Sequence, residues 1–457
     1  MEGFTERQVI VQGVSEGFHN AATALVEGDR ILYASEAERH SRIKNDRFLG
    51  NYLRDLDADV RVFYEDVPLK NARRMAYGQK ALNGKIYDRY SYSRNHHESH
   101  AASAYYTSPF DDDVVVVVID AIGEWDTSSI WTVENGNLKK VWGQIYPNSL
   151  GLFYSAITKR LGLKPNEDEY ITMGMAAYGE PCIDMSWCFP GEWHKGFSLD
   201  DFKGYHPYDI AASAQMQLEY EISKIMHIAQ QYGKNLCYAG GVALNCVANS
   251  KIREMFDMMW VFPNPGDAGA SLGAALAHTK RKVHFPHNFL GTMIDRPLSP
   301  TYVVDELMKN KVVGVANGKA EFGPRALGNR SLLGDVRYDI RNHVNRIKQR
   351  QKFRPFAPAI LSEFYDEYFD GWANAYMSFV SWAKHDYKSV THVDGSARVQ
   401  LVYPSDDCRL RMILEEYYER TGIPMLLNTS LNIKGMPMVD TWDHAVEFEK
   451  KYGVKVF

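Results

Sequence analysis

The sequence is poor in cysteine and lacks any long hydrophobic run. Its five cysteines are irregularly spaced with no CxxC pair, which indicates neither a zinc ribbon nor a disulfide framework and predicts buried free thiols. The longest purely aliphatic run, Val114–Ile119, is far too short to span a bilayer, and Met1–Glu6 has no apolar core of a signal peptide. We therefore expect a cytoplasmic protein with no membrane partner. The cysteines are Cys182, Cys188, Cys237, Cys246 and Cys408.

A strong excess of charge is missing as well. The chain has 52 Lys and Arg against 57 Asp and Glu, a net charge of −5. This balance argues against a protein that coats nucleic acid non-specifically, while leaving a local basic site open. Hydrophobic residues at 45% and charged residues at 24% exclude a disordered or fibrous chain. At 457 residues the chain exceeds what one hydrophobic core usually organises, so two α/β domains of unequal size are expected.

Apolar strands with small or acidic residues at their ends mark the first domain. Three continuous apolar runs have the pattern of strands buried on both faces, each with a helical pattern behind it. Ligands of α/β sheets lie at the carboxyl ends of strands, so the three junctions should face one cleft. They are Val114–Ile119 before Asp120, Leu236–Ala239 before Gly240 and Gly241, and Met258–Phe262 before Asp267. Upstream, a strand at Val9–Val14 precedes a predicted hairpin of Ala22–Val26 and Ile31–Ala34.

A second domain is expected after the break at Pro286–Pro300, where proline and glycine interrupt the periodicity. It begins with a strand at Val312–Ala316 and ends with a helix that Gly422 stops, followed by a strand at Met425–Leu427. The apolar face of that helix consists of Leu410, Ile413, Leu414 and Tyr417. The predicted domains are residues 1–292 and 299–457.

A pair of histidines four residues apart is the first candidate site. On a helix, His96 and His100 would present both imidazoles on one face, about 5–6 Å apart. Such a pair is half of a site for Fe, Zn or Mn, and Asp120 and Asp267 at strand ends are natural carboxylates to complete it. A lone pair of this spacing is more often structural, and the two aspartates favour the metal. A zinc-protease motif needs two residues between its Glu and its second His, and this chain has one.

Small-residue turns at the three strand ends indicate a nucleotide-like ligand. Such turns let backbone amides approach a phosphate or ribose closely, and a helix N-terminus favours negative charge. Close helix packing explains each glycine cluster nearly as well. The residues singled out are Gly123, Glu124, Gly240, Gly241 and Asn245.

A dense run of cations in the second domain is the next candidate. A solvated basic face is the simpler interpretation, but turn residues and apolar flanks between the cations favour side chains that face inward around a polyanion. We therefore predict a triphosphate or acyl-phosphate pocket. The cations are Lys319, Arg325, Arg330, Arg337, Arg341, Arg346, Lys348, Arg350, Lys352 and Arg354. Polar candidates for the same ligand are Arg398, in the cluster from His392 to Gln400, with Asn428, Ser430 and Asn432.

These motifs together resemble the O-carbamoyltransferases of antibiotic and nodulation-factor biosynthesis, from about Gly17 to Phe448. The matching N-terminal segments are Gly17–Asn20, Glu36–Arg39, His96–Ala102, Asp120–Trp125 and the stretches after Gly240 and Gly266. The matching C-terminal segments are Glu321–Ser331, Phe353–Pro358, Thr391–Gln400 and Asn428–Asn432.

The resemblance implies two linked reaction sites. The C-terminal domain is similar to threonylcarbamoyl-adenylate synthases, whose Lys-x-Arg and Ser-x-Asn motifs would be Lys348 with Arg350 and Ser430 with Asn432. It would make carbamoyl-adenylate from carbamoyl phosphate and ATP, the latter with Mg. The N-terminal domain is similar to tRNA threonylcarbamoyl transferases of the actin/Hsp70-like (ASKHA) fold. There the carbamoyl group would pass to an acceptor hydroxyl beside a metal, typically iron, on the histidine pair and an aspartate.

The acceptor is left open by the resemblance. Its usual class is a hydroxyl of a sugar or another natural product, with a hydroxymethyl pyrimidine of phage-type DNA or its nucleotide as an alternative. A threonylcarbamoyl-type tRNA modifier and a non-catalytic nucleotide-binding module are further alternatives, and a homodimer is not excluded. His19 is the candidate general base for the acceptor, against the simpler view of a hydrogen-bonded hairpin histidine.

Four positions depart from the family's pattern. Asn20 replaces the usual Asp, so it cannot act as a carboxylate, and Lys319 replaces an Arg, which keeps the charge and loses the fork. Ile171 and Thr172 occupy the place where a Lys often precedes the Met-Gly turn, and Gln351 stands where Glu is common. None of these removes the histidine pair or the main group of cations.

Overall fold

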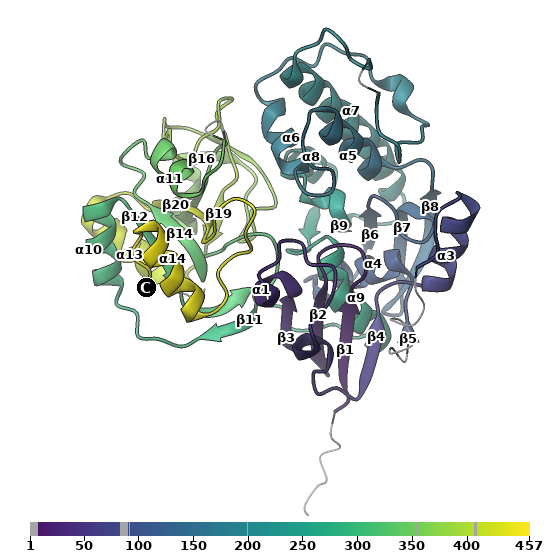
Figure 1. Ribbon diagram of the computed structural model, residues 1–457, viewed down its shortest axis with the longest axis horizontal. Coiled ribbons are helices and arrows are strands. Elements are labelled where there is room, and N and C mark those ends of the chain that lie inside the picture. The colour runs from purple at the N-terminus through teal and green to yellow at the C-terminus, as the bar shows by residue number, and fades with distance from the viewer. Residues whose placement is uncertain (1–7, 83–89, 91, 199, 352–353, 406–408) are drawn as a thin grey trace, which may run out of the picture.

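The computed structural model describes residues 8–82, 90, 92–198, 200–351, 354–405 and 409–457. Met1–Glu6, Lys352, Phe353 and Cys408 lie outside the described residues. Figure 1 shows the C-terminal part, coloured green to yellow, as a body beside the larger N-terminal part. None of the helices within the described ranges is long and apolar enough to cross a membrane.

The first sheet of the N-terminal part has the strand order β3-β2-β1-β4-β5. Its first three strands are antiparallel neighbours, while β4 and β5 run parallel to β1. The predicted hairpin is confirmed as β2 and β3. The strands are β1 (Ile10–Ser15), β2 (Ala22–Glu27), β3 (Arg30–Glu36), β4 (Val60–Phe63) and β5 (Tyr92–Ser93). Short helices α1 (Ala37–Ser41), α2 (Asn51–Arg54) and α3 (Val67–Ala76) follow these strands.

The second sheet repeats the topology of the first. Read from its other edge, its order β8-β7-β6-β9-β10 has the same antiparallel and parallel neighbours. Two sheets of this topology in one chain are the arrangement of actin and Hsp70, so the predicted fold class is confirmed. The strands are β6 (Val114–Ile119), β7 (Asp126–Glu134), β8 (Asn137–Ile145), β9 (Asn235–Ala239) and β10 (Met258–Val261). The helical pattern expected behind Val114–Ile119 was wrong, because antiparallel strand β7 follows that turn.

Two helices, α4 (His96–Thr107) and α9 (Asp267–Thr279), pack against each other and bring the predicted site together. Their approach depends on Gly273, since a Cβ built there would lie 1.7 Å from the carbonyl oxygen of Ser99. Helix α9 also packs on β1 and β2. The remaining N-terminal helices are α5 (Leu150–Arg160), α6 (Glu169–Ala176), α7 (Pro207–Ala229) and α8 (Cys246–Arg253).

The C-terminal part is an α/β unit around the sheet β12-β14-β20-β15-β19. Helices α10 and α13 pack together over it, and the predicted face of α13, from Leu410 to Tyr417, is fully buried. Its strands are β12 (Val312–Ala316), β14 (Arg330–Gly334), β15 (Ala357–Leu361), β19 (Gln400–Val402) and β20 (Met425–Ser430). Its helices are α10 (Pro300–Asn310), α11 (Arg341–Ile347), α12 (Tyr365–Tyr368), α13 (Arg409–Thr421) and α14 (Trp442–Tyr452).

Two small sheets complete the described chain. Strand β11 (Phe289–Ile294) pairs with β13 (Gly318–Glu321), so the segment between the two parts is tied into the C-terminal one. The other small sheet has β16 (Phe369–Gly371), β17 (Ser381–Ala383) and β18 (Ser396–Ala397). Among the described cysteines, Cys188, Cys237 and Cys246 are buried free thiols as predicted. The prediction was wrong for Cys182, which is exposed on a loop.

Candidate functional site

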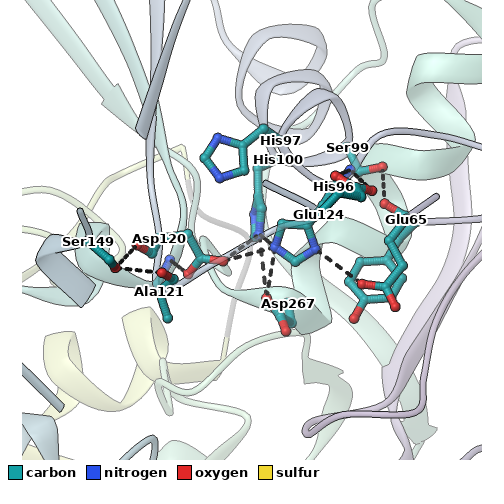
Figure 2. Close-up of polar contacts among 12 residues, drawn as sticks. Glu65, His96, His97, Ser99, His100, Asp120, Ala121, Glu124, Ser149 and Asp267 are labelled. Atoms are coloured by element: carbon teal, nitrogen blue, oxygen red, sulfur yellow. Dashed lines mark hydrogen bonds and ion pairs between the residues drawn. The ribbon is translucent and has the colours of Figure 1, made fainter. Parts of the chain in front are cut away.

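The two histidines and two aspartates predicted as metal ligands converge between α4, β6 and α9 (Figure 2). His96 Nε2 lies 2.9 Å from Asp120 Oδ2 and 3.6 Å from Asp267 Oδ1. His100 Nε2 lies 3.2 Å from His96 Nε2 and 3.5 Å from Asp267 Oδ1. One donor atom from each of the four residues therefore falls within 4.8 Å of every other.

This donor set fits a transition-metal ion. Nitrogen and oxygen ligands at about 2.0–2.2 Å from a metal lie about 3–3.5 Å from each other. The histidine nitrogens lie 3.2 Å apart and 2.9–3.8 Å from the carboxylate oxygens, which is close to that spacing, and His100 Nδ1 is buried with no hydrogen-bond partner among the described residues. Behind His96, Glu65 lies 3.8 Å from Nδ1, as expected of a carboxylate that orients a metal-binding imidazole. His96, His100, Asp120 and Asp267 would hold the ion.

Charges inside this cluster compensate one another. Burial lowers the pKa of His96, but its hydrogen bond to Asp120 and the nearby carboxylates of Glu65 and Asp267 outweigh burial and raise that pKa well above the ordinary value. Burial acts the other way on Asp120, whose pKa is nevertheless held well below its usual range by the hydrogen bond to His96 and the charge of His100. The carboxylate is thus kept ionised and available as a ligand.

Gly123 and Glu124, in the turn after β6, position helix α4 and are not among the residues that border the cavity. Glu124 is 1% exposed, and its carboxylate accepts hydrogen bonds from the backbone N–H groups of Asp66 and His96. A Cβ on Gly123 would lie 3.1 Å from His96 Cβ, so this glycine permits close packing on the helix. Both residues were predicted to line a nucleotide site, and the structure instead places them against α4. The Glu124 carboxylate and the close packing at Gly123 fix the N-terminus of the helix that carries both histidines.

The second glycine turn reaches the cluster directly. Gly240 has a φ of 91°, and a Cβ there would meet the backbone of Ile119 at 2.2 Å. The N–H of Gly241 then donates to Asp120 Oδ1 at 3.0 Å and orients the carboxylate. Asn245 borders the cavity, caps α8 through Ala248 N–H, and exchanges amide hydrogen bonds with Gln215.

His19 and Asn20 lie beside the same cluster. His19 Nε2 is 3.9 Å from Asp267 Oδ2, and 29% of the His19 side chain is exposed to the cavity side. Asn20 adopts a left-handed φ of 52°, which asparagine tolerates better than most residues. The imidazole thus faces the carboxylate that would bind the ion.

In the C-terminal part, the two short motifs converge on one lysine. Lys348 is 4% exposed, and its Nζ donates to the hydroxyl of Ser430 at 3.1 Å and to the side-chain oxygen of Asn432 at 2.9 Å. The backbone carbonyls of both residues also accept from it. Burial, with the charges of Arg350 and Arg354, lowers the pKa of Lys348 well below its usual value.

Arginines without carboxylate partners surround this lysine. Within the described residues, none of Arg325, Arg350, Arg354 and Arg398 forms an ion pair. Burial and the charge of Arg398 lower the pKa of Arg325 to about 9, and burial with the charge of Arg354 lowers that of Arg350 well below its usual value. Arg354 lies over the Tyr170 ring at 4.6 Å. Mutually repelling, desolvated cations of this kind are stabilised by an anionic ligand.

Other predicted cations do not reach the cavity. Arg330 is fully buried, and its guanidinium donates only to backbone carbonyls, including those of Asp440 and Thr292. These carbonyls take up its donors, so the structure does not bring Arg330 into the predicted anion pocket. Lys319, on β13, is also not among the residues that border the cavity. Arg337 and Arg341 pair with neighbouring aspartates, and Arg346 is exposed.

One cavity of about 920 Å³ joins the two groups of residues. His19, Asp120, Asp267 and Gly241 border its N-terminal side, with the buried histidines directly behind the aspartates. Its C-terminal side is bordered by Arg325, Lys348, Arg350, Arg354, Arg398, Asn428, Ser430 and Asn432. The structure thus brings the predicted metal ligands and most of the predicted anion-binding residues to a single space.

Two residues of the site were not predicted from the sequence. Glu65, behind His96, follows strand β4 by two positions, so the rule that polar residues matter at strand ends could have found it. Tyr170, under Arg354, carries no such signal, because its partner lies in the other part of the chain.

Comparison with known proteins agrees with this architecture. The family models described as Carbamoyltransferase N-terminus and Carbamoyltransferase C-terminus match residues 63–186 with 194–276, and residues 304–457, respectively. An uncharacterized protein of Synechocystis is 30% identical over 95% of this chain and 93% of its own length. The nodulation protein NolNO of Sinorhizobium fredii is 28% identical over 94% of this chain and 76% of its own.

The chain belongs to the carbamoyltransferase family. It is accordingly an enzyme that transfers a carbamoyl group, and the resemblance drawn from its motifs is confirmed. Among solved structures, component A of the (R)-2-hydroxyglutaryl-CoA dehydratase of Acidaminococcus fermentans aligns with a TM-score of 0.40 at 15% identity, over 60% of this chain and 99% of that one. The actin/Hsp70-like arrangement is seen in the strand order of the two N-terminal sheets.

Proposed function

We propose that this protein is an ATP-dependent O-carbamoyltransferase that forms carbamoyl-adenylate at Lys348 and transfers its carbamoyl group to a hydroxyl near the histidine pair. One observation carries the proposal: Lys348, bound to Ser430 and Asn432, borders the same cavity as Asp120 and Asp267. A mixed anhydride hydrolyses readily in water, and a shared cavity limits its escape between the two steps.

The C-terminal side suits two anionic substrates. Carbamoyl phosphate and ATP repel each other, so bringing them together requires cations that are not already neutralised. Arg325, Arg350, Arg354 and Arg398 meet that requirement. Arginine forks bind phosphate oxygens in pairs, while Lys348 is held as a point charge, which supports the similarity to threonylcarbamoyl-adenylate synthases. Mg would accompany the triphosphate.

The N-terminal side suits transfer to a hydroxyl. An Fe, Zn or Mn ion on His96, His100, Asp120 and Asp267 would polarise a carbonyl or acceptor oxygen when bound. His19 lies 3.9 Å from Asp267, where it could take the proton of the acceptor hydroxyl. We propose a hydroxyl of a sugar or another natural product as the acceptor.

The proposed function is tested by determining which donor supports pyrophosphate release from ATP. Purified protein is incubated with ATP and either carbamoyl phosphate or bicarbonate with threonine, and pyrophosphate is measured. Carbamoyl phosphate should support release, and bicarbonate with threonine should not. Release only with bicarbonate and threonine would identify a threonylcarbamoyl-type enzyme, and ATP binding without release on either donor would identify a binding module. A panel of hydroxyl acceptors, including hydroxymethyl pyrimidine nucleotides and DNA, is then read by mass for one added carbamoyl group.

A further inference from the structure

A buried histidine whose ring forms no hydrogen bond with the described residues borders the C-terminal side of the cavity. The side chain of His392 is 6% exposed, and neither ring nitrogen has a hydrogen-bond partner among the described residues. Buried polar groups are nearly always bonded, so an unpartnered buried imidazole at a cavity wall indicates a ligand or reactant there. The site described above assigns no role to this residue.

A carboxylate and an aromatic ring hold this imidazole. Asp394 Oδ1 lies 3.6 Å from His392 Nδ1, and Ser396 fixes the carboxylate by donating its N–H at 2.9 Å and its hydroxyl at 2.7 Å. Although burial raises the pKa of Asp394, the nearby His392 imidazole and the hydrogen bonds from Ser396 lower it to about 2. From the N-terminal part, the Tyr178 ring meets the imidazole edge-on, with the ring centroids 5.2 Å apart. Burial raises the pKa of Tyr178, and the positive charge of Arg341 acts to lower it. An Nδ1–H facing Asp394 leaves the Nε2 lone pair free to accept a proton.

The mass balance of the proposed first reaction requires such a base. Carbamoyl phosphate and ATP can yield carbamoyl-adenylate, pyrophosphate and phosphate only if one water molecule is consumed. That water gives carbamate and hydrogen phosphate from the carbamoyl phosphate dianion, and one proton is left over. A group in the cavity must accept this proton for water to be an effective nucleophile.

Neighbouring groups are poorly suited to accept it. Arg325, Arg350, Arg354 and Arg398 have no lone pair to offer. Burial lowers the pKa of Lys348, but its Nζ already contacts four oxygens of Ser430 and Asn432, which leaves little room beside it for the attacking water. The carboxylate of Asp394 is too weak a base at a pKa of about 2.

On the basis of the proposed function, we infer that His392, oriented by Asp394, is the general base for hydrolysis of carbamoyl phosphate. The imidazole takes a proton from water as the water oxygen bonds to the carbonyl carbon. The bond from that carbon to the phosphate oxygen breaks, and its electron pair leaves with phosphate. The remaining hydroxyl proton passes to phosphate, which gives carbamate, hydrogen phosphate and imidazolium. A carbamate oxygen then attacks the α-phosphorus of ATP and releases pyrophosphate without further need of this base.

Carbamate is the product of the hydrolysis step and the reactant of the adenylation step. Supplying it directly therefore allows adenylation to be measured without hydrolysis. His392→Gln and Asp394→Asn are compared with wild type and with His343→Gln, an exposed histidine on α11 that does not border the cavity. Phosphate release is measured with carbamoyl phosphate, and pyrophosphate release with ATP and either carbamoyl phosphate or freshly dissolved ammonium carbamate. In His392→Gln, phosphate release should fall about 10²-fold or more, while pyrophosphate release from carbamate stays within about twofold of wild type. Asp394→Asn should show a smaller loss of the same kind.

Two results would overturn the inference. One is phosphate release at the wild-type rate in His392→Gln. The other is loss of carbamate-driven pyrophosphate release in a folded variant, which would assign His392 to the adenylation step. Asp394→Asn keeps the imidazole and decides the question if the His392 variant does not fold. Failure of the wild type to release pyrophosphate from ATP and carbamoyl phosphate would instead refute the proposed function.

Discussion

At the residue scale, two arginines 24 positions apart have opposite environments. Arg330 is buried with its donors on backbone carbonyls, whereas Arg354 borders the cavity over an aromatic ring and forms no ion pair with a carboxylate of the described residues. The first guanidinium ties together buried segments of backbone, and the second is placed to bind a ligand. Arg330 therefore stabilises the fold, whereas Arg354 is placed to bind substrate.

This contrast predicts opposite effects of the same substitution. Arg330→Met should lower the free energy of unfolding by about 3–5 kcal/mol, because several buried carbonyls lose their donor. Arg354→Met should change stability little, because it removes a repelling charge, and should lower pyrophosphate release about 10²-fold. Denaturant unfolding and the pyrophosphate assay check both. A severely destabilised Arg354→Met with an active, stable Arg330→Met would contradict the assignment.

The sequence shows that both residues are cations, but it could not distinguish the one that binds backbone carbonyls from the one that borders the cavity. A cation among turn residues has the same pattern whether it faces a ligand or backbone carbonyls, since the acceptors at Thr292 and Asp440 are distant in sequence. The metal set was more predictable, because an i, i+4 pair shares a helix face and strand-end aspartates meet at one edge.

At the element scale, helices α4 and α9 determine the geometry of the candidate metal site. One carries both histidines and the other begins at Asp267, so the distance between the helices sets the distance between the ligands. Gly273 makes this contact close. The turn after β6 contributes through Glu124, whose carboxylate accepts from the His96 N–H. The sequence predicted a nucleotide contact at this turn, because a glycine turn for packing and one for phosphate have the same sequence pattern.

Gly273→Ala should therefore disturb the site without touching a ligand. A Cβ 1.7 Å from the backbone oxygen of Ser99 forces the helices apart, which should cost about 1–3 kcal/mol of stability and lower the metal content of the purified protein. Gly50→Ala is the control, since a Cβ there meets nothing within 4 Å. Thermal unfolding and elemental analysis give the readouts. Unchanged metal content in a destabilised Gly273→Ala protein would show that α9 does not control the ligand geometry.

At the scale of the whole molecule, the two parts of the chain are bound together around the cavity. Arg39 donates to the carbonyl of Gly323 at 2.8 Å, and Arg42 to those of Met438 and Pro437. On another side, Asn249 and Ser250 of α8 bond to the backbone at Ser378 and Val380. These contacts hold the group of cations and the cluster of histidines and aspartates around one cavity, a relation between distant segments that no local sequence pattern reports.

If one cavity serves two separable reactions, a change at the histidine pair should abolish the second reaction and spare the first. The most direct test is His96→Ala, assayed for pyrophosphate release from ATP and carbamoyl phosphate and for carbamoylated acceptor by mass. We expect pyrophosphate release near the wild-type rate, because Lys348 and the arginines are unchanged, with acceptor carbamoylation reduced at least about 10²-fold. Loss of both activities in a folded His96→Ala protein, or carbamoylation at the wild-type rate, would contradict it.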